Sequence, residues 1–275
     1  MSTNKVAVVT GSNKGIGLAI VRSLCKKYEG HVYLTSRNEE RGKEAIKLLE
    51  SEGLSPKFHQ LDIDDKTSIE KLRDYMVSAY NGIDVLINNA GIAFKNADTT
   101  PFGIQAKVTL KTNYFSTLDA SNILIPVVKS GGRVVNVSSM VSAWNIKKCS
   151  PELQQLFRSS TITEDQLSEK MNEFIEHAKE GTHQEAGYPN TAYGVSKIGV
   201  TVMTFIHARR LREQGKNDIL LNCCCPGWVR TDMAGPKAPK TPDEGAETPV
   251  FLALLPQGSA EPHGKYLSDK TVHEW

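Results

Sequence analysis

The 275-residue sequence lacks the features of several large classes of protein. It contains no stretch of about 18 apolar residues, so we expect no membrane-spanning helix and no membrane partner. The opening stretch MSTNKVAVVTGS holds only four apolar residues in a row, too few for a secretory signal peptide. There is no run of five basic residues, and the formal net charge is only +2, so we expect no nucleic-acid partner.

Cysteine and histidine are sparse, and their arrangement excludes further classes. The five cysteines include three consecutive ones, Cys223, Cys224 and Cys225, which do not form a disulfide framework. We therefore expect a reducing, cytoplasmic compartment. These three thiols are either inert strand residues, the interpretation we favour, or sensitive groups near a site. The seven histidines show no H-x-x-x-H spacing, so no metal is expected, and no G-x-S-x-G motif indicates a hydrolase.

Short apolar runs alternate with helix-periodic segments along most of the chain. The expected strands are 6–9, 31–36, 57–61, 83–87, 133–137 and 219–223, and the expected helices are 15–28, 39–52, 66–80, 105–129 and 190–212. This alternation predicts an α/β fold with a doubly wound parallel sheet, Rossmann-like, in a single domain over residues 1–275. Ligands of such sheets bind beyond the carboxyl ends of the strands.

A glycine-rich turn, Thr10-Gly-Ser-Asn-Lys-Gly-Ile-Gly17, follows the first expected strand. Its three glycines allow a tight turn and close approach to a pyrophosphate, and the next helix offers free amide groups and a positive dipole end. The spacing is not the usual G-x-G-x-x-G, and many such turns are only turns. The motif therefore suggests a dinucleotide site without deciding it.

Cations near the end of the second strand indicate which dinucleotide would bind. Arg37 lies 20 residues after the last glycine of the turn, where an acidic residue would bind the ribose of NAD. An arginine there, with Lys14 and Arg41, suits the 2′-phosphate of NADP. Alternatively these are solvated surface charges, and Glu39 and Glu40 remain candidate ribose ligands. We expect NADP(H).

Polar residues also follow the later strands. Asp62 could accept a hydrogen bond from the adenine amino group, or be an ordinary turn aspartate. The run Asn88-Asn89-Ala90-Gly91 could tie neighbouring strands together and support the cofactor, or reflect turn chemistry. Because the carboxyl ends of parallel strands share one edge of a sheet, we expect these groups to gather there.

These motifs, in this order, resemble the pattern of the short-chain dehydrogenase/reductase family. Its elements are found at Thr10 to Gly17, Asn88 to Gly91, Ser139, Tyr193 to Lys197, and Pro226-Gly227. The resemblance implies a catalytic tetrad of Asn113, Ser139, Tyr193 and Lys197. A second Y-x-x-x-K, from Tyr266 to Lys270, has no such companions, and we interpret it as surface structure.

The resemblance also implies contacts with the cofactor and the substrate. The cofactor residues would be Gly11, Asn13, Lys14, Gly15, Ile16, Gly17, Arg37, Arg41, Asp62, Ile63, Asn89, Ala90, Gly91, Tyr193, Lys197, Pro226, Gly227, Val229 and Thr231. The substrate residues would be Ser139, Met140, Tyr193 and Trp228. Trp228 could instead be a core or lid residue, and Ser12, where relatives often have glycine, should be tolerated.

The implied tetrad makes chemical sense for carbonyl reduction. Tyr193 would act as general acid, and Ser139 would orient the carbonyl oxygen. Lys197 at about 5 Å from the phenolate would contribute roughly 3 kcal/mol at an effective dielectric of about 20, so we expect it to lower the pKa of Tyr193 by about two units. Asn113 would hold a water that relays protons to Lys197.

The segment between Ser139 and Tyr193 is longer than a strand-to-helix link needs. Ser150-Pro151 and the capping box Thr163 to Gln166 predict helices, so residues 140–188 should form a helical insertion before the Tyr193 helix. In the family, the helices that flank the site commonly form the dimer interface. The insertion leads into the Tyr193 helix and should cover that surface, so we expect a monomer.

The insertion and the segments Gly53 to Asp65, Ser150 to Arg158 and Pro226 to Pro236 resemble the monomeric carbonyl reductases of animals. That resemblance implies an NADPH-dependent reductase of ketones, aldehydes and quinones, extending to prostaglandins and steroids, with small-molecule carbonyl compounds as partners. Two other interpretations stay open. One is a non-catalytic dinucleotide sensor, and the other is an NAD-dependent enzyme that oxidises alcohols.

Overall fold

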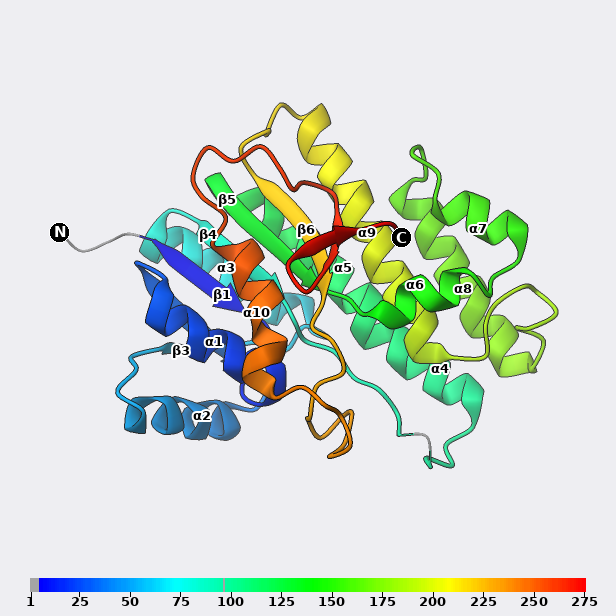
Figure 1. Cartoon of the computed structure of the whole chain (residues 1–275), viewed down its shortest axis with the longest axis horizontal. Coiled ribbons are helices and arrows are strands. Elements are labelled where there is room, and N and C mark those ends of the chain that lie inside the picture. The colour runs from blue at the N-terminus through cyan, green and yellow to red at the C-terminus, as the bar shows by residue number, and fades with distance from the viewer. Residues whose placement is uncertain (1–4, 96) are drawn as a thin grey trace.

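A mostly parallel sheet forms the centre of the computed structural model, which describes residues 5–95 and 97–275 (Figure 1). Its strand order is β3-β2-β1-β4-β5-β6-β7-β8, and only the β7–β8 pair is antiparallel. The strands are β1 Val6–Val9, β2 His31–Ser36, β3 Lys57–Gln60, β4 Ile83–Asn88, β5 Val128–Val137, β6 Leu220–Cys225, β7 Tyr266–Ser268 and β8 Thr271–His273. The predicted α/β class with a parallel sheet is confirmed.

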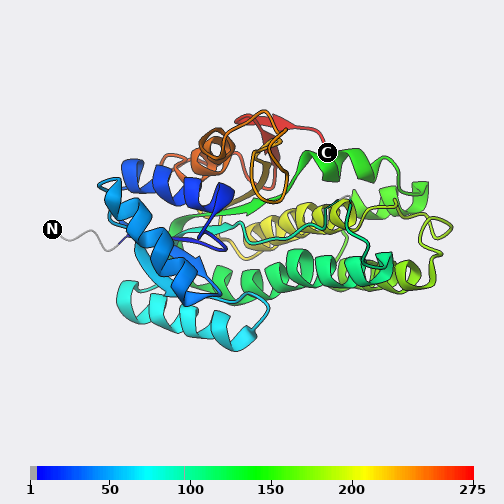
Figure 2. The same cartoon turned by 90° about the horizontal axis from the view of Figure 1, so that it is seen from below.

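Helices cover both faces of this sheet. In chain order, the helices of the structure are α1 Gly15–Lys27, α2 Glu39–Ser51, α3 Lys66–Tyr80, α4 Phe102–Leu110, the π-helical turn η1 Lys111–Ser116, α5 Thr117–Leu124, the 3₁₀ turn η2 Ile125–Val127, α6 Met140–Ile146, α7 Pro151–Phe157, α8 Glu164–Glu180, α9 Ala192–Glu213 and α10 Pro242–Ala253. Figure 2 shows α1 and α10 on one side and α3 and α5 on the other. No helix in the described part of the chain is both long enough and apolar enough to cross a membrane.

The two faces of β1 show why the strands are continuous apolar runs. Val6 and Val8 pack in the core on the α3 and α5 side, whereas Ala7 and Val9 pack in the core beneath α1 and α10. Successive side chains of a strand point to opposite faces, so a strand covered on both sides must be apolar at every position. The doubly wound arrangement therefore follows directly from the sequence pattern.

Three expectations about elements were wrong. The helix expected to reach residue 129 ends at Val127, and β5 begins at Val128, because Pro126 lies in the closing 3₁₀ turn. None of β7, β8 and α10 was expected. Tyr266 is buried in β7 rather than on the surface, and Lys270 lies with positive φ in the turn to β8, so this second Y-x-x-x-K is not helical.

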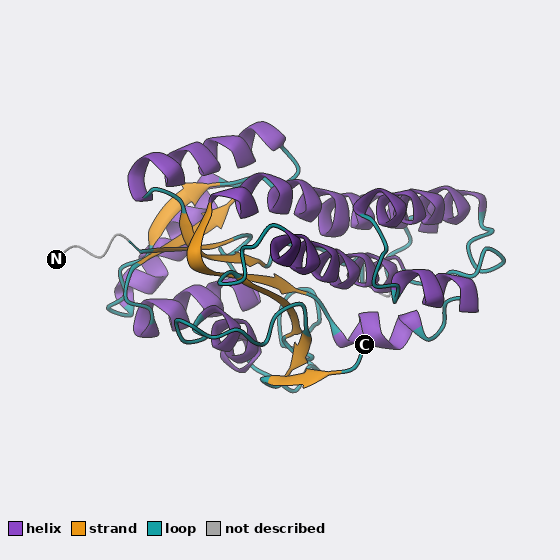
Figure 3. Ribbon diagram, turned by 90° about the horizontal axis from the view of Figure 1, so that it is seen from above, coloured by secondary structure: helices purple, strands orange, loops and turns teal. Residues whose placement is uncertain are grey.

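The helical insertion extends the molecule beyond the sheet. Figure 3 shows one end of the molecule that contains helices and no strands. There α7 and α8 pack with α4 and α9 around a separate apolar core that includes Phe157, Phe174 and Met203. The predicted caps are present: Ser150 accepts from the backbone of Leu153, and Thr163 and Gln166 form the capping box.

An ion-pair network fastens the start of α8 to its neighbours. Glu164 accepts hydrogen bonds from His207 Nε2 and Arg210 Nη2 on α9, both at 2.9 Å, and from Asn122 Nδ2 on α5 at 2.8 Å. The bond from His207 contributes most to lowering the pKa of Glu164 to about 2. The carboxylate is mostly buried, so these bonds are protected from solvent screening.

Replacing Glu164 with glutamine should lower the free energy of unfolding by about 1–2 kcal/mol at pH 7. A carboxylate whose folded-state pKa is depressed stabilises the fold above its ordinary pKa of 4.5, and this contribution is lost as the pH falls toward about 2. The difference between the two proteins, measured by urea unfolding, should therefore shrink below pH 4.5. Glu176→Gln, on the exposed face of α8, is the control and should be neutral. An equal loss in both variants would contradict this role.

Candidate active site

The four predicted catalytic side chains converge from three elements. Ser139 is the N-cap of α6, Tyr193 and Lys197 lie one turn apart at the start of α9, and Asn113 lies in η1. Thr191 caps α9 by accepting from the backbone of Gly194, which fixes where the helix begins. The Lys197 ammonium lies 5.7 Å from the centroid of the Tyr193 ring.

Asn113 connects the tetrad to the loop after β4. Its Oδ1 accepts from the backbone N–H of Ile92 at 2.7 Å, and its Nδ2 donates to the carbonyl of Ile92 at 2.8 Å and to Ser196 Oγ at 3.0 Å. A Cβ on Gly91 would lie 3.2 Å from Asn113 Oδ1 and 3.8 Å from Lys197 Nζ. The amide protons of Asn113 are thus used within the protein, and the π-helical turn presents this side chain to the loop.

Burial controls the protonation of the tyrosine–lysine pair. Lys197 is 6% exposed, donates to the carbonyl of Val137 at 2.8 Å, and has its pKa lowered to about 8 by burial. Burial raises the pKa of Tyr193 to about 12, opposed by a hydrogen bond with Ser139. Desolvation of the phenolate dominates in this structure, so the lowering of the Tyr193 pKa by Lys197 stays a prediction for the site with the dinucleotide bound.

The glycine turn is held tightly against the loop after β4. Gly11 has φ +59°, and a Cβ there would lie 2.8 Å from Cα of Ala90. A Cβ on Gly17 would lie 2.6 Å from Asn89 Nδ2, which itself donates to the carbonyls of Thr10 and Gly11 at 3.0 Å. These contacts explain why glycine is needed at both positions.

The start of α1 suits a phosphate group. Lys14 is its N-cap but makes no side-chain capping bond, and the first turn carries no acidic residue. α4 and α5 also lack a side-chain cap, whereas α2, α3, α8, α9 and α10 are capped by a side chain. Uncapped amide groups and the positive end of the helix dipole favour an anion. Asn13 and Ile16 lie on either side of the start of α1. Because this helix start is uncapped and carries no acidic residue, it fits a dinucleotide pyrophosphate.

Two other predictions about the strand ends have structural answers. Ser12 is fully buried and bridges β1 and β2, donating to the carbonyl of Val9 at 2.8 Å and accepting from the backbone of Thr35 at 2.9 Å. Asn88 Nδ2 donates to Asn136 Oδ1 at 2.9 Å, so it ties β4 to β5 as expected. The serine thus fits the turn, because its hydroxyl adds these bonds to the one that its backbone N–H donates to the carbonyl of Thr35.

The cations predicted for the 2′-phosphate lie at the end of β2 and in the glycine turn. Arg37 and Arg41 are exposed, and neither guanidinium forms an ion pair with any residue that the structure describes. Lys14 Nζ instead pairs with Asp232 at 2.8 Å. Asp62 Oδ1 accepts from the backbone of Asp64, so the turn interpretation holds at least in part, and the neighbouring Ile63 is buried.

The segment after β6 lies beside the glycine turn. Pro226 and Val229 are buried, Gly227 has φ +89°, and the side chain of Thr231 would contact a Cβ on Gly15 at 3.3 Å. Trp228 is 53% exposed, so the alternative of a core tryptophan is wrong. Asp232, which no sequence motif marks, connects this segment to the glycine turn through its ion pair with Lys14.

Met140 follows Ser139 directly and is the first residue of α6. It is half-buried and packs against Cys223, Cys225 and Tyr266.

The three consecutive cysteines of β6 are free thiols and are buried, which favours the interpretation as inert strand residues. Burial raises the pKa of Cys223 to about 12.

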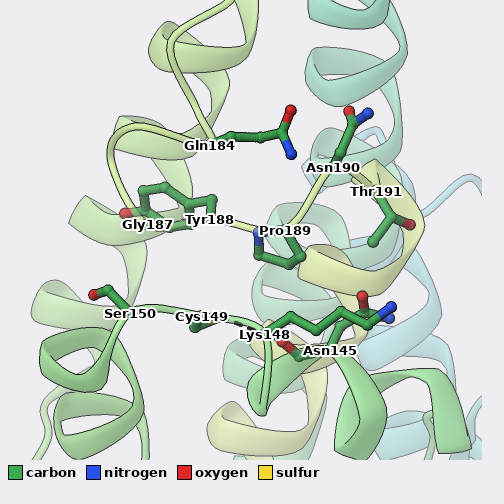
Figure 4. A pocket seen from close by; sticks show the side chains of 10 residues that line it. All are labelled: Asn145, Lys148, Cys149, Ser150, Gln184, Gly187, Tyr188, Pro189, Asn190 and Thr191. Carbon is green, nitrogen blue, oxygen red and sulfur yellow. Dashed lines mark hydrogen bonds between the residues drawn. The ribbon is translucent and has the colours of Figure 1, made fainter.

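A cavity of about 640 Å³ opens between the link from α6 to α7 and the segment before α9 (Figure 4). Its wall includes Asn145, Lys148, Gln184 and Thr191, the cap of the helix that carries Tyr193. No motif marks these residues, because two loops far apart in the sequence supply them.

Among the described residues, no group of three or more His, Cys, Asp or Glu side chains is arranged to hold a metal ion.

Sequence comparisons with known proteins identify the same family as the motifs of this site. Residues 5–150 match the model of a family described as short chain dehydrogenase. Carbonyl reductase (NADPH) 1 of Bos taurus is 62% identical over 275 residues, covering 100% of this chain and 99% of that protein. The protein of the same name from Homo sapiens is 63% identical over 271 residues, 98% of each chain.

Solved structures share the fold at full length. Salutaridine reductase from Papaver somniferum superposes with a TM-score of 0.86 at 30% identity, covering 96% of this chain and 99% of its own. Menthone neomenthol reductase from Mentha piperita has a TM-score of 0.80, also at 30% identity, covering 97% and 99%. The helical insertion therefore falls within the length that these structures cover.

Proposed function

This chain belongs to the short-chain dehydrogenase/reductase family, and on that premise we propose that it is an NADPH-dependent carbonyl reductase acting on ketones, aldehydes and quinones. The observation that carries the proposal is the convergence of Tyr193 and Lys197 with Ser139 and Asn113 at the carboxyl edge of the sheet. Full-length identity of about 62% to proteins named NADPH carbonyl reductases supports the same activity. A non-catalytic sensor would have no use for this tetrad.

NADPH, when bound, would supply the hydride. Ser139 and Tyr193 would hold the carbonyl oxygen, and the Tyr193 hydroxyl would donate the proton to the oxygen as it becomes an alkoxide. The raised pKa of Tyr193 keeps the phenol protonated at neutral pH, and an alkoxide is a far stronger base than a phenolate, so this transfer runs downhill. Lys197, whose pKa is about 8, is still mostly charged at neutral pH and would stabilise the phenolate that remains. The protonated phenol is the form that the reduction step requires.

The chain's own residues supply the cofactor site in this proposal. The uncapped start of α1 would bind the pyrophosphate, and Arg37 and Arg41 would bind the 2′-phosphate. Trp228 and Met140 would flank the substrate, with the exposed indole offering a flat apolar surface to aromatic carbonyl compounds.

Loss of absorbance at the reduced-nicotinamide band, with menadione as substrate, tests this function when NADPH and NADH are run in parallel. We expect turnover with NADPH and much slower turnover with NADH. Turnover with neither would reject the enzyme in favour of a sensor, and a preference for NADH would favour an NAD-dependent alcohol dehydrogenase. A panel of ketones, aldehydes, quinones, prostaglandins and steroids compared by kcat/KM would then rank the substrates.

We also infer that the chain is a monomer. The insertion helix α8 packs against α4 and α9 through residues such as Met171 and Phe174, so it covers a helical surface that would otherwise be open to a second copy. Sedimentation equilibrium should give a mass near 30.3 kDa. A mass of about twice that value would overturn the inference.

A cytoplasmic location is proposed on the strength of the thiols. All five cysteines are free, and the three on β6 are buried where no disulfide partner can reach them without unfolding. Recovery of the full-length protein in a lumenal or membrane fraction of cells would contradict this location.

A further inference from the structure

Trp275 follows the last strand of the sheet, and its ring packs against α9, the helix that carries Tyr193 and Lys197. Its ring packs edge-on against Phe205 of α9, with centroids 5.6 Å apart, and borders both the insertion core and the small cluster of Cys223, Cys225 and Tyr266. Its carbonyl accepts from Arg158 Nε at 3.3 Å. In Figures 1 and 2 the point marked C lies beside α6.

The indole makes one polar contact, and its direction is fixed. Trp275 Nε1 donates to Ser142 Oγ at 2.9 Å. Ser142 is fully buried in α6, and its hydroxyl donates to the carbonyl of Ser139 at 2.7 Å. Because an indole N–H can only donate, it occupies an acceptor site of Ser142 and leaves the serine proton for the Ser139 carbonyl.

The same hydroxyl connects to the helix that carries the tyrosine and the lysine. Thr201 Oγ1 lies 3.2 Å from Ser142 Oγ and 3.0 Å from the carbonyl of Lys197. Thr201 Oγ1 also lies 2.7 Å from Ser138 Oγ, which is 3.2 Å from the same Lys197 carbonyl. Ser142 is therefore the junction between the start of α6 and the Lys197 turn of α9.

We propose that Trp275 is a positioning residue for carbonyl reduction, holding Ser139 in register with Tyr193 and Lys197 through Ser142 and Thr201. The inference rests on the proposed function, since it concerns the same tetrad. The indole's hydrogen bond is with Ser142 and its ring contact is with Phe205, so its effect on the tetrad passes through the buried hydroxyl groups. Each of them is nine-tenths or more buried, and water cannot readily replace a lost partner there.

Trp275→Phe tests the bond, because phenylalanine keeps a ring against Phe205 but has no N–H. We expect kcat to fall about three- to tenfold, the range for one lost hydrogen bond, with KM and NADPH affinity unchanged. Ser142→Ala should give a similar loss, and the double variant should be no worse than Ser142→Ala alone, because both changes break one chain of contacts. Trp144→Phe, on the exposed face of α6, is the matched control and should leave all values unchanged.

Thermal unfolding of each variant separates positioning from packing. An unchanged kcat in Trp275→Phe, with or without a lower Tm, would overturn the inference, as would losses that multiply in the double variant. If Trp275→Phe does not fold, Ser142→Ala decides, since it leaves the indole in place. A wild-type protein that reduces no carbonyl compound would instead reject the proposed function, and the positioning role would fall with it.

Discussion

Replacing Tyr193 with phenylalanine should lower kcat by about 10²–10⁴-fold while leaving NADPH affinity unchanged, the range expected for loss of a general acid. The hydroxyl is hydrogen-bonded to Ser139, and the ring lies beside Lys197. Phenylalanine fills the same space, so the fold and the cofactor site at the glycine turn should persist. Stopped-flow or steady-state absorbance with menadione gives kcat, and quenching of protein fluorescence gives the affinity for NADPH.

The second Y-x-x-x-K of the sequence provides the control for this experiment. Tyr266→Phe removes a phenol from β7, where the ring packs against the cysteine strand rather than beside a lysine. Its kcat should stay near the wild-type value. Full activity in Tyr193→Phe, or an equal loss in both variants, would show that Tyr193 is not the proton donor.

Local signals in the sequence predicted the elements that depend on local chemistry. The capping box at Thr163 and the Ser150-Pro151 start are hydrogen bonds within one turn, so the sequence alone contains them. The same kind of signal marks α10, where Thr241 and Glu244 form a capping box, but Pro249 inside the helix breaks the periodic pattern and hid it. Strand β7 is only three residues long and exists because β6 offers it an edge, which no local pattern reveals.

The candidate site also has features that the sequence indicates and features that depend on contacts between distant segments. The resemblance of the ordered motifs to the family pattern implied the tetrad, although Asn113 and the pair Tyr193 and Lys197 lie in helical segments rather than at strand ends. The raised pKa of Tyr193 was not foreseeable, because it depends on how completely distant segments exclude water from the ring. The pairing of Lys14 with Asp232 joins residues 218 positions apart, and the bond from Trp275 to Ser142 spans 133.

Replacing Arg37 with alanine should lower kcat/KM for NADPH by about 10–100-fold and leave the value for NADH nearly unchanged. A guanidinium can bind a phosphate with two parallel hydrogen bonds, and a hydrogen bond to a charged group contributes about 1.5–3 kcal/mol. Only NADPH carries the 2′-phosphate, so the loss must be selective. Lys43→Ala, which removes an exposed cation from the neighbouring helix α2, is the control and should affect both cofactors equally and weakly.

Comparing the loss of NADPH selectivity in Arg37→Ala and Lys14→Ala gives a second test of which cation binds the 2′-phosphate. Lys14 already pairs with Asp232, so a phosphate must compete with a carboxylate for its ammonium, whereas Arg37 has no acidic partner among the described residues. The selective loss in Arg37→Ala should therefore exceed that in Lys14→Ala. Equal losses for NADPH and NADH in Arg37→Ala would show that this residue supports the pocket rather than reading the phosphate. A larger selective loss in Lys14→Ala would move the phosphate site to the glycine turn.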